Sequence, residues 1–188
     1  MHQYKGRLIV HTGSMFSGKT SSLEKDIKRF KIAGYRTVVF KPSIDTRYDN
    51  EKIVTHDNTF LSAINVKDFK EMESYLKKED VDIVGIDEAN FFNVDIETSL
   101  EVVDNFLRKG KTVVVAGLDM DYTAKPFELV KELMVRADYL YKHHAVCTKC
   151  GSDAWVSHRK TDNEERIVLG AFDEYEPLCR NCYNKIDD

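Results

Sequence analysis

The sequence predicts an α/β fold, in which a parallel sheet flanked by helices is followed by a small ribbon-like module. Over residues 1–142, short apolar runs alternate with segments of helical period. Such alternation indicates a parallel sheet with right-handed crossovers. From residue 143 the pattern changes to paired cysteines and short β-like runs. We therefore place the core in residues 1–142 and a second module in residues 143–188.

Each element of the predicted core follows from its local pattern. The predicted strands are short apolar runs bounded by turn residues, at 7–12, 37–40, 82–86, 112–116 and 139–141. The predicted helices have apolar residues at helical spacing and lie between capping or breaking residues, at 20–33, 68–78, 95–108 and 127–136. We expect Lys41-Pro42 to stop the second strand. The polar segment 43–58 has no clear period and is predicted to be mainly loop.

Composition narrows the possible partners. The chain has 188 residues and a net charge of -4, whereas non-specific binding of nucleic acid needs a basic face. Its first apolar run is too short for a signal peptide, and no stretch approaches the ~20 apolar residues of a membrane span. We expect a cytoplasmic protein with no nucleic-acid or membrane partner.

The turn between the first predicted strand and the first predicted helix carries the string GSMFSGKT. It fits the P-loop pattern G-x-x-x-x-G-K-[ST] in the required strand–loop–helix setting. Its glycines and the helix N-terminus let backbone N–H groups cradle phosphate oxygens. We expect Lys19 to reach the β- and γ-phosphates and Thr20 to bind Mg²⁺. The core is therefore predicted to be of the P-loop NTPase type, with a nucleoside triphosphate bound by Gly13, Ser14, Met15, Phe16, Ser17, Gly18, Lys19 and Thr20.

Two carboxylates, Asp87 and Glu88, follow the predicted strand 82–86. A carboxylate at a strand end beside a P-loop holds Mg²⁺, so we expect Asp87 to bind the ion directly or through water. Glu88 is then placed to act as a general base. The residues alone leave open whether its proton comes from water or from a substrate hydroxyl.

The four cysteines form two C-x-x-C pairs, and they are Cys147, Cys150, Cys179 and Cys182. Two such pairs offer four thiolates to one tetrahedral zinc ion, which leaves no open position and makes the ion structural. A redox role is disfavoured because neither pair is expected to open a helix after a strand. His143, His144 and His158 lie nearby and are expected at the surface.

Residues 151–178 separate the two cysteine pairs, more than the roughly 15–20 residues usual for a zinc ribbon. The segment must therefore loop out between its two pinned ends. Such a loop suits a lid over a site, and its Gly170, Ala171 and Tyr175 could approach a flat ligand.

Strings along most of the chain resemble the thymidine kinase family of the cellular, zinc-containing type (type II). They are GSMFSGKT at 13–20, KPSIDTRY at 41–48, THD at 55–57, IDEANFF at 86–92, AGLD at 116–119, KPF at 125–127, AVC at 145–147 and GAFDEYEPLCRNCY at 170–183. The last string is especially specific to the family.

The resemblance implies ATP-dependent phosphorylation of thymidine at its 5′-hydroxyl, which gives thymidine monophosphate in nucleotide salvage. It implies that Glu88 takes its proton from the nucleoside rather than from water, with Lys19 and Arg47 near the transferring phosphate. Besides the P-loop, the implied ATP and magnesium site contains Asp45, Asp87, Glu88, Ala89 and Asn90. Asn90 departs from the family, which commonly has Gln there.

The resemblance also implies a thymidine site in which backbone groups of the lid hold the base. Its implied residues are Met15, Phe91, Leu118, Tyr122, Ser157, Val168, Leu169, Gly170, Ala171, Phe172 and Tyr175. Met15, Leu118 and Ser157 would surround the 5-methyl group, and Phe91 and Tyr122 would flank the base. Tyr122 stands where Phe is common in the family.

Further partners come from the same resemblance. The implied cofactors are ATP, Mg²⁺ and structural Zn²⁺, and the implied assembly is a homotetramer inhibited by thymidine triphosphate. Deoxyuridine is a further candidate acceptor, because one methyl is worth only ~1–3 kcal/mol of discrimination. The alternative function is a P-loop ATPase with a structural zinc module, which would hydrolyse ATP without a nucleoside.

Overall fold

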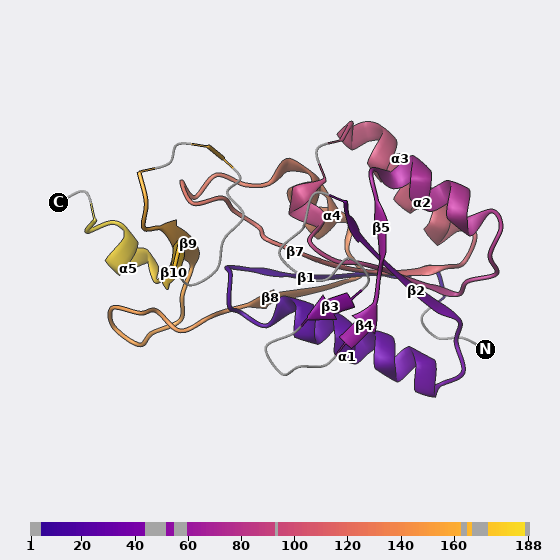
Figure 1. The fold of residues 1–188 in the computed structure, drawn as a ribbon, viewed down its shortest axis with the longest axis horizontal. Helices are drawn as coiled ribbons and strands as arrows, with labels where there is room; N and C mark the ends of the chain where they lie inside the picture. Colours follow the sequence, from indigo (N-terminus) through magenta and orange to yellow (C-terminus); the bar gives the residue numbers. More distant parts are fainter. Residues whose placement is uncertain are drawn as a thin grey trace.

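A six-stranded parallel sheet forms the centre of the computed structural model (Figure 1). The structure describes residues 5–43, 52–54, 60–92, 94–162, 165–166 and 173–186. Neighbouring strands are all parallel, as the alternating pattern predicts. In order across the sheet, the strands are β5 (Ile64–Val66), β2 (Thr37–Pro42), β6 (Ile83–Ile86), β7 (Thr112–Gly117), β1 (Leu8–Gly13) and β8 (Tyr139–His143).

Helices cover both faces of this sheet. In Figure 1, α1 lies below the sheet, while α2, α3 and α4 lie above it. The α2 and α3 helices begin at aspartates, Asp68 and Asp95, whose carboxylates accept hydrogen bonds from backbone N–H groups three residues on. The four helices are α1 (Lys19–Ile32), α2 (Phe69–Leu76), α3 (Ile96–Arg108) and α4 (Glu128–Arg136). All four, and the five predicted core strands, are present within two residues of their predicted bounds.

The core has two apolar layers, one on each side of the sheet. Along β7, Val113 and Val115 face the layer beneath α2, α3 and α4, while Val114 and Ala116 face α1. A strand buried on both faces is expected to be continuously apolar, which is why the TVVVA run lacks alternation.

The second module follows β8. Its antiparallel strands β9 (Val156–Arg159) and β10 (Tyr175–Leu178) precede a single helical turn, α5 (Arg180–Tyr183). A small apolar cluster of Val156, Leu178 and two cysteines lies between them. β8 ends at His143, one residue past the predicted boundary between the core and the second module. The division into these two modules stays a prediction.

Three details of the strand prediction were wrong. β2 continues through Pro42, because at that point it pairs only with β5, and no partner on the other side needs the missing N–H. The edge strand β5 was not predicted. The pair β3 (Lys52–Val54) and β4 (Phe60–Ser62) was also missed, and β3 falls in the segment predicted as mainly loop. Each missed strand has three residues, too few to show a period.

Candidate active site

The loop between β1 and α1 has the strained backbone of a phosphate cradle. Gly13, Phe16 and Gly18 all have positive φ, at 137°, 63° and 81°. A Cβ on Gly13 would lie 2.1 Å from the carbonyl oxygen of His143, so only glycine fits there. Lys19 is buried, and its Nζ donates to the carbonyl oxygen of Ser14 at 3.3 Å. The loop therefore closes around its lysine, whose binding to the phosphates stays a prediction.

The two predicted magnesium ligands meet beside this loop. The hydroxyl of Thr20 donates to Oδ1 of Asp87 at 3.1 Å. Burial, with a smaller contribution from the charge of Glu88, raises the pKa of Asp87 to about 7. A hydroxyl and a buried carboxylate are hard oxygen ligands of the kind that Mg²⁺ prefers. These two residues therefore have the chemistry to hold a magnesium ion.

Glu88 occupies a turn that holds its backbone in an uncommon conformation. Its φ is 51°, and its carbonyl oxygen accepts the N–H of Phe91 to open the 3₁₀ turn η1 (Ala89–Phe91). A non-glycine residue at positive φ is strained, and such strain gathers at functional sites. The side chain is half-buried directly after Asp87, and its role as general base stays a prediction.

Ala89 and Asn90 face inward from the same turn. Ala89 is fully buried in the core layer beneath α2, α3 and α4. Asn90 is 5% exposed, and its Oδ1 accepts the backbone N–H of Leu118 at 2.9 Å. The amide of Asn90 thus joins the Glu88 turn to the end of β7. Its predicted role in the nucleotide site stays a prediction.

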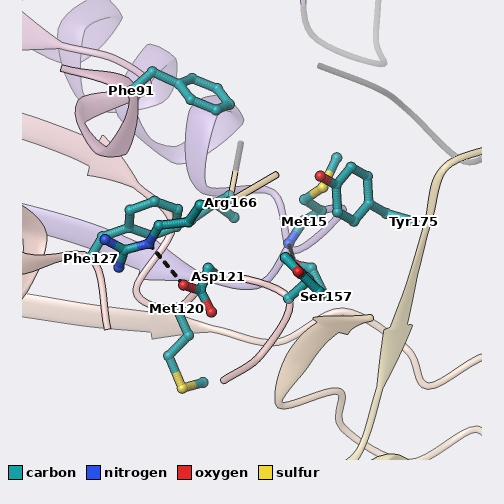
Figure 2. A pocket seen from close by; sticks show the side chains of 10 residues that line it. Met15, Phe91, Met120, Asp121, Phe127, Ser157, Arg166 and Tyr175 are labelled. Carbon is teal, nitrogen blue, oxygen red and sulfur yellow. Dashed lines mark hydrogen bonds and ion pairs between the residues drawn. The ribbon is translucent and has the colours of Figure 1, made fainter. Parts of the chain in front are cut away.

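A pocket adjoins the P-loop on the side of the second module. It encloses about 350 Å³ of empty space, counting the part open to solvent. Figure 2 shows Met15, Ser157 and Tyr175 on one side of it, and Phe127, Asp121 and Arg166 on the other. Its walls include every described residue that the resemblance assigns to thymidine, namely Met15, Phe91, Leu118, Tyr122, Ser157 and Tyr175.

One backbone contact connects this pocket to the phosphate cradle. Met15 belongs to the P-loop, and its N–H donates to Oγ of Ser157 at 2.8 Å. Ser157 lies on β9 and is buried. The second module is therefore attached directly to the P-loop, with the pocket between them.

The four cysteines converge on one point. Their sulfur atoms all lie within 4.8 Å of one another, and the Cys150 and Cys179 sulfurs are 3.6 Å apart. Tetrahedral zinc with Zn–S bonds of about 2.3 Å requires sulfurs about 3.8 Å apart. The cluster therefore fits a structural zinc ion.

Two expectations around the cysteines were wrong. Cys179 caps α5 directly after β10, so the second pair does open a short helix, and its position alone does not argue against redox chemistry. The convergence of both pairs is the better argument for zinc. His144 is exposed as expected, but His143 and His158 are half-buried. His143 bonds to the buried His11 at 3.0 Å, and His158 faces Glu176 at 3.5 Å.

The family model for thymidine kinase matches residues 6–183. The chain belongs to the thymidine kinase family. It is 42% identical to a thymidine kinase of Bacteroides thetaiotaomicron, over 95% of this chain and 87% of that one. It is 43% identical to a thymidine kinase of Rhodothermus sp., over 95% of this chain and 81% of that one.

Another family member, from Porphyromonas gingivalis, is 42% identical over 96% of this chain and 86% of its own length. Among solved structures, the flagellar accessory protein FlaH of Methanocaldococcus jannaschii has a similar fold, with a TM-score of 0.57 at 13% identity. That match covers 79% of this chain and 75% of FlaH.

Within the described part of the chain, every helix is too short or too polar to cross a membrane.

Some residues that the thymidine kinase resemblance assigns cannot be placed. They lie outside the described residues and stay predictions: Asp45, Arg47, Val168, Leu169, Gly170, Ala171 and Phe172. Conversely, four pocket residues were missed, namely Met120, Asp121, Phe127 and Arg166. A signal existed for Asp121, because it follows the carboxyl end of a core strand, where ligand sites of parallel sheets gather. No local pattern marks Arg166.

Proposed function

We propose that this chain transfers the γ-phosphoryl group of ATP to the 5′-hydroxyl of thymidine, giving thymidine monophosphate. Family membership supports the reaction. The observation that carries it in this chain is the place of Met15, which belongs both to the phosphate cradle and to the wall of the pocket. A donor triphosphate in the cradle and a nucleoside in the pocket would therefore lie side by side.

The residues of the cradle have separate tasks in this reaction. Backbone N–H groups of the P-loop and Lys19 bind the β- and γ-phosphates. Thr20 and Asp87 would hold Mg²⁺, which would offset negative charge on the phosphate oxygens. Glu88 accepts the proton of the 5′-hydroxyl as that oxygen attacks phosphorus. Arg47 would stabilise the charge on the transferring group, and Asp45, Ala89 and Asn90 complete the proposed nucleotide site.

The pocket holds the acceptor nucleoside in position beside the phosphates. Phe91 and Tyr122 flank the flat base, and Met15 and Leu118 pack against its 5-methyl group. Tyr175 contacts the nucleoside. Backbone groups of residues 168–172 complete the proposed site by bonding to the polar edge of thymine. Confining the 5′-hydroxyl in this way converts a bimolecular encounter into a positioned one.

Several further features belong to the proposal. The four converging cysteines would bind structural Zn²⁺, and the ion would hold both ends of the segment that carries Tyr175. The active assembly is a homotetramer in the cytoplasm, with thymidine triphosphate as feedback inhibitor and deoxyuridine as a weaker acceptor. It has no nucleic-acid or membrane partner.

Thymidine-dependent release of ADP from ATP tests the function. We expect ADP to form only when thymidine is present, with Mg²⁺ required. Equal release without a nucleoside would support the alternative, a P-loop ATPase with a structural zinc module.

A further inference from the structure

An ion pair lies in the wall of the nucleoside pocket. Most lining side chains are apolar, aromatic or hydroxylic, but Asp121 and Arg166 are charged. Asp121 lies in the loop after β7, and Arg166 belongs to the second module. Figure 2 shows the guanidinium of Arg166 directed at the carboxylate of Asp121. The two modules therefore meet at this pair, across the pocket from the contact between Met15 and Ser157.

Hydrogen bonds within its own loop hold the carboxylate of Asp121 in place, independently of Arg166. Oδ1 of Asp121 accepts the hydroxyl of Thr123 at 2.7 Å and the backbone N–H groups of Thr123 and Lys125 at 3.0 and 3.1 Å. The side chain is 3% exposed. Burial opposes its charge, but the bonds from Thr123, Lys125 and Arg166 outweigh burial and lower the pKa of Asp121. Asp121 is therefore a rigid, charged anchor at neutral pH.

Arg166 makes three contacts with the loop that carries this anchor. Its Nε donates to Oδ2 of Asp121 at 2.9 Å, and its Nη2 donates to the carbonyl oxygen of Pro126 at 2.7 Å. The guanidinium carbon also lies 5.0 Å from the centre of the Phe127 ring. Each contact is to the 121–127 loop, so one side chain holds the second module against that loop.

A second arginine fixes the backbone beneath Arg166. Arg159 on β9 is 4% exposed and donates from Nη2 to the carbonyl oxygen of Arg166 at 3.4 Å. Its Nε and Nη2 bind the hydroxyl of Tyr175 at 3.2 and 2.7 Å, and its guanidinium lies 3.8 Å from the centre of the Tyr122 ring. Both tyrosines line the pocket. The backbone at Arg166 is thus connected to the two tyrosines through one buried cation.

We propose that Arg166 is a positioning residue for the nucleoside, which holds the outer wall of the pocket closed by binding Asp121. This inference rests on the proposed function. Without the ion pair, the two modules stay joined beside the pocket through the bond from Met15 to Ser157 and through the contacts of Arg159 and Tyr183 with Tyr122. The backbone at Arg166 then loses its side-chain contacts to the 121–127 loop, and the wall that this loop forms can move away from the base. Loss of the pair should weaken nucleoside binding while leaving the P-loop and Glu88 in place.

The test compares steady-state kinetics of Arg166→Met, Arg166→Lys and a matched control, Arg136→Met. Arg136 is a half-exposed arginine paired with Asp104 at 3.7 Å on the helical face of the core, so its loss should leave all constants unchanged. For Arg166→Met we expect the KM for thymidine to rise about five- to tenfold, since a part-exposed ion pair and a charge-assisted hydrogen bond are lost together. The KM for ATP and kcat should stay within about twofold.

Arg166→Lys should recover part of the loss, because lysine keeps the charge but not both hydrogen bonds. Asp121→Asn provides a second route if Arg166→Met folds poorly, and it should raise the KM for thymidine alone. An unchanged KM for thymidine in Arg166→Met and Asp121→Asn would overturn the proposal. Equal rises in both KM values would also overturn it, because they would indicate a general structural role. Thymidine-independent ADP release by the wild-type protein would instead refute the proposed function.

Discussion

Asn90 offers a quantitative test of how the Glu88 turn is joined to the pocket. Asn90→Ala removes the acceptor of the Leu118 N–H, while Nδ2 of Asn90 has no partner among the described residues. One hydrogen bond is therefore lost, and it leaves a buried backbone donor unsatisfied. Such a loss costs about 1–3 kcal/mol. We expect a free energy of unfolding lower by about 2 kcal/mol, which corresponds to a melting temperature lower by about 4–8 °C for a chain of this size.

Thermal unfolding followed by circular dichroism measures this effect, with Asn105→Ala as the control. Asn105 is a half-buried residue of α3, and its Nδ2 lies 3.4 Å from Oε1 of Glu73. That bond is long, and alanine is the better helix former, so the control should be nearly neutral. Because Leu118 also lines the pocket, Asn90→Ala should raise the KM for thymidine. A melting temperature no lower than that of Asn105→Ala would show that the bond from Leu118 to Asn90 does not stabilise the fold.

Three further predictions concern the base, the zinc site and the sheet. Glu88→Gln should retain ATP and thymidine binding by calorimetry but lose at least about 100-fold in kcat; near-normal turnover would exclude Glu88 as the base. Cys150→Ser should lower bound zinc, measured by elemental analysis, and destabilise the second module; stoichiometric zinc in that variant would remove Cys150 from the ligand set. Hydrogen bonds from Arg36 lower the pKa of Asp82 to about 2, so this pair stabilises the fold above the ordinary pKa of 3.8 and loses its effect as pH falls through about 2. Asp82→Asn should therefore cost up to about 1 kcal/mol at pH 7 and nothing near pH 1, and a constant difference at all pH values would contradict this assignment.

The parts of the fold that could be predicted are those whose signal is local. The P-loop string can be recognised because it lies between an apolar run and an amphipathic segment. β7 is buried on both faces, so its continuously apolar TVVVA run identifies it as a strand without information from other segments. The strand β5 has three residues, and only pairing with Phe40–Pro42 makes it a strand. Pro42 was misjudged for the same reason, because proline's effect depends on which side of the strand carries a partner.

The residues of the candidate site also differ in whether a local sequence pattern reveals them. Lys19, Thr20 and Asp87 could be assigned because their residue types and spacing encode the chemistry. The residues of the pocket needed the family resemblance, since aromatic and apolar side chains there look like core. Arg166 and Asp121 pair across 45 positions of sequence, and no pattern within the chain connects them. Such contacts are decided by the docking of two modules, which the sequence of either module does not reveal.

The fate of the γ-phosphate of ATP distinguishes a thymidine kinase from an ATPase. Incubation of the wild-type protein with thymidine, Mg²⁺ and ATP labelled at the γ-phosphate yields products that chromatography separates. We expect label on the 5′-position of thymidine monophosphate, with little in inorganic phosphate. Label found only in inorganic phosphate, at a rate that thymidine does not change, would contradict it.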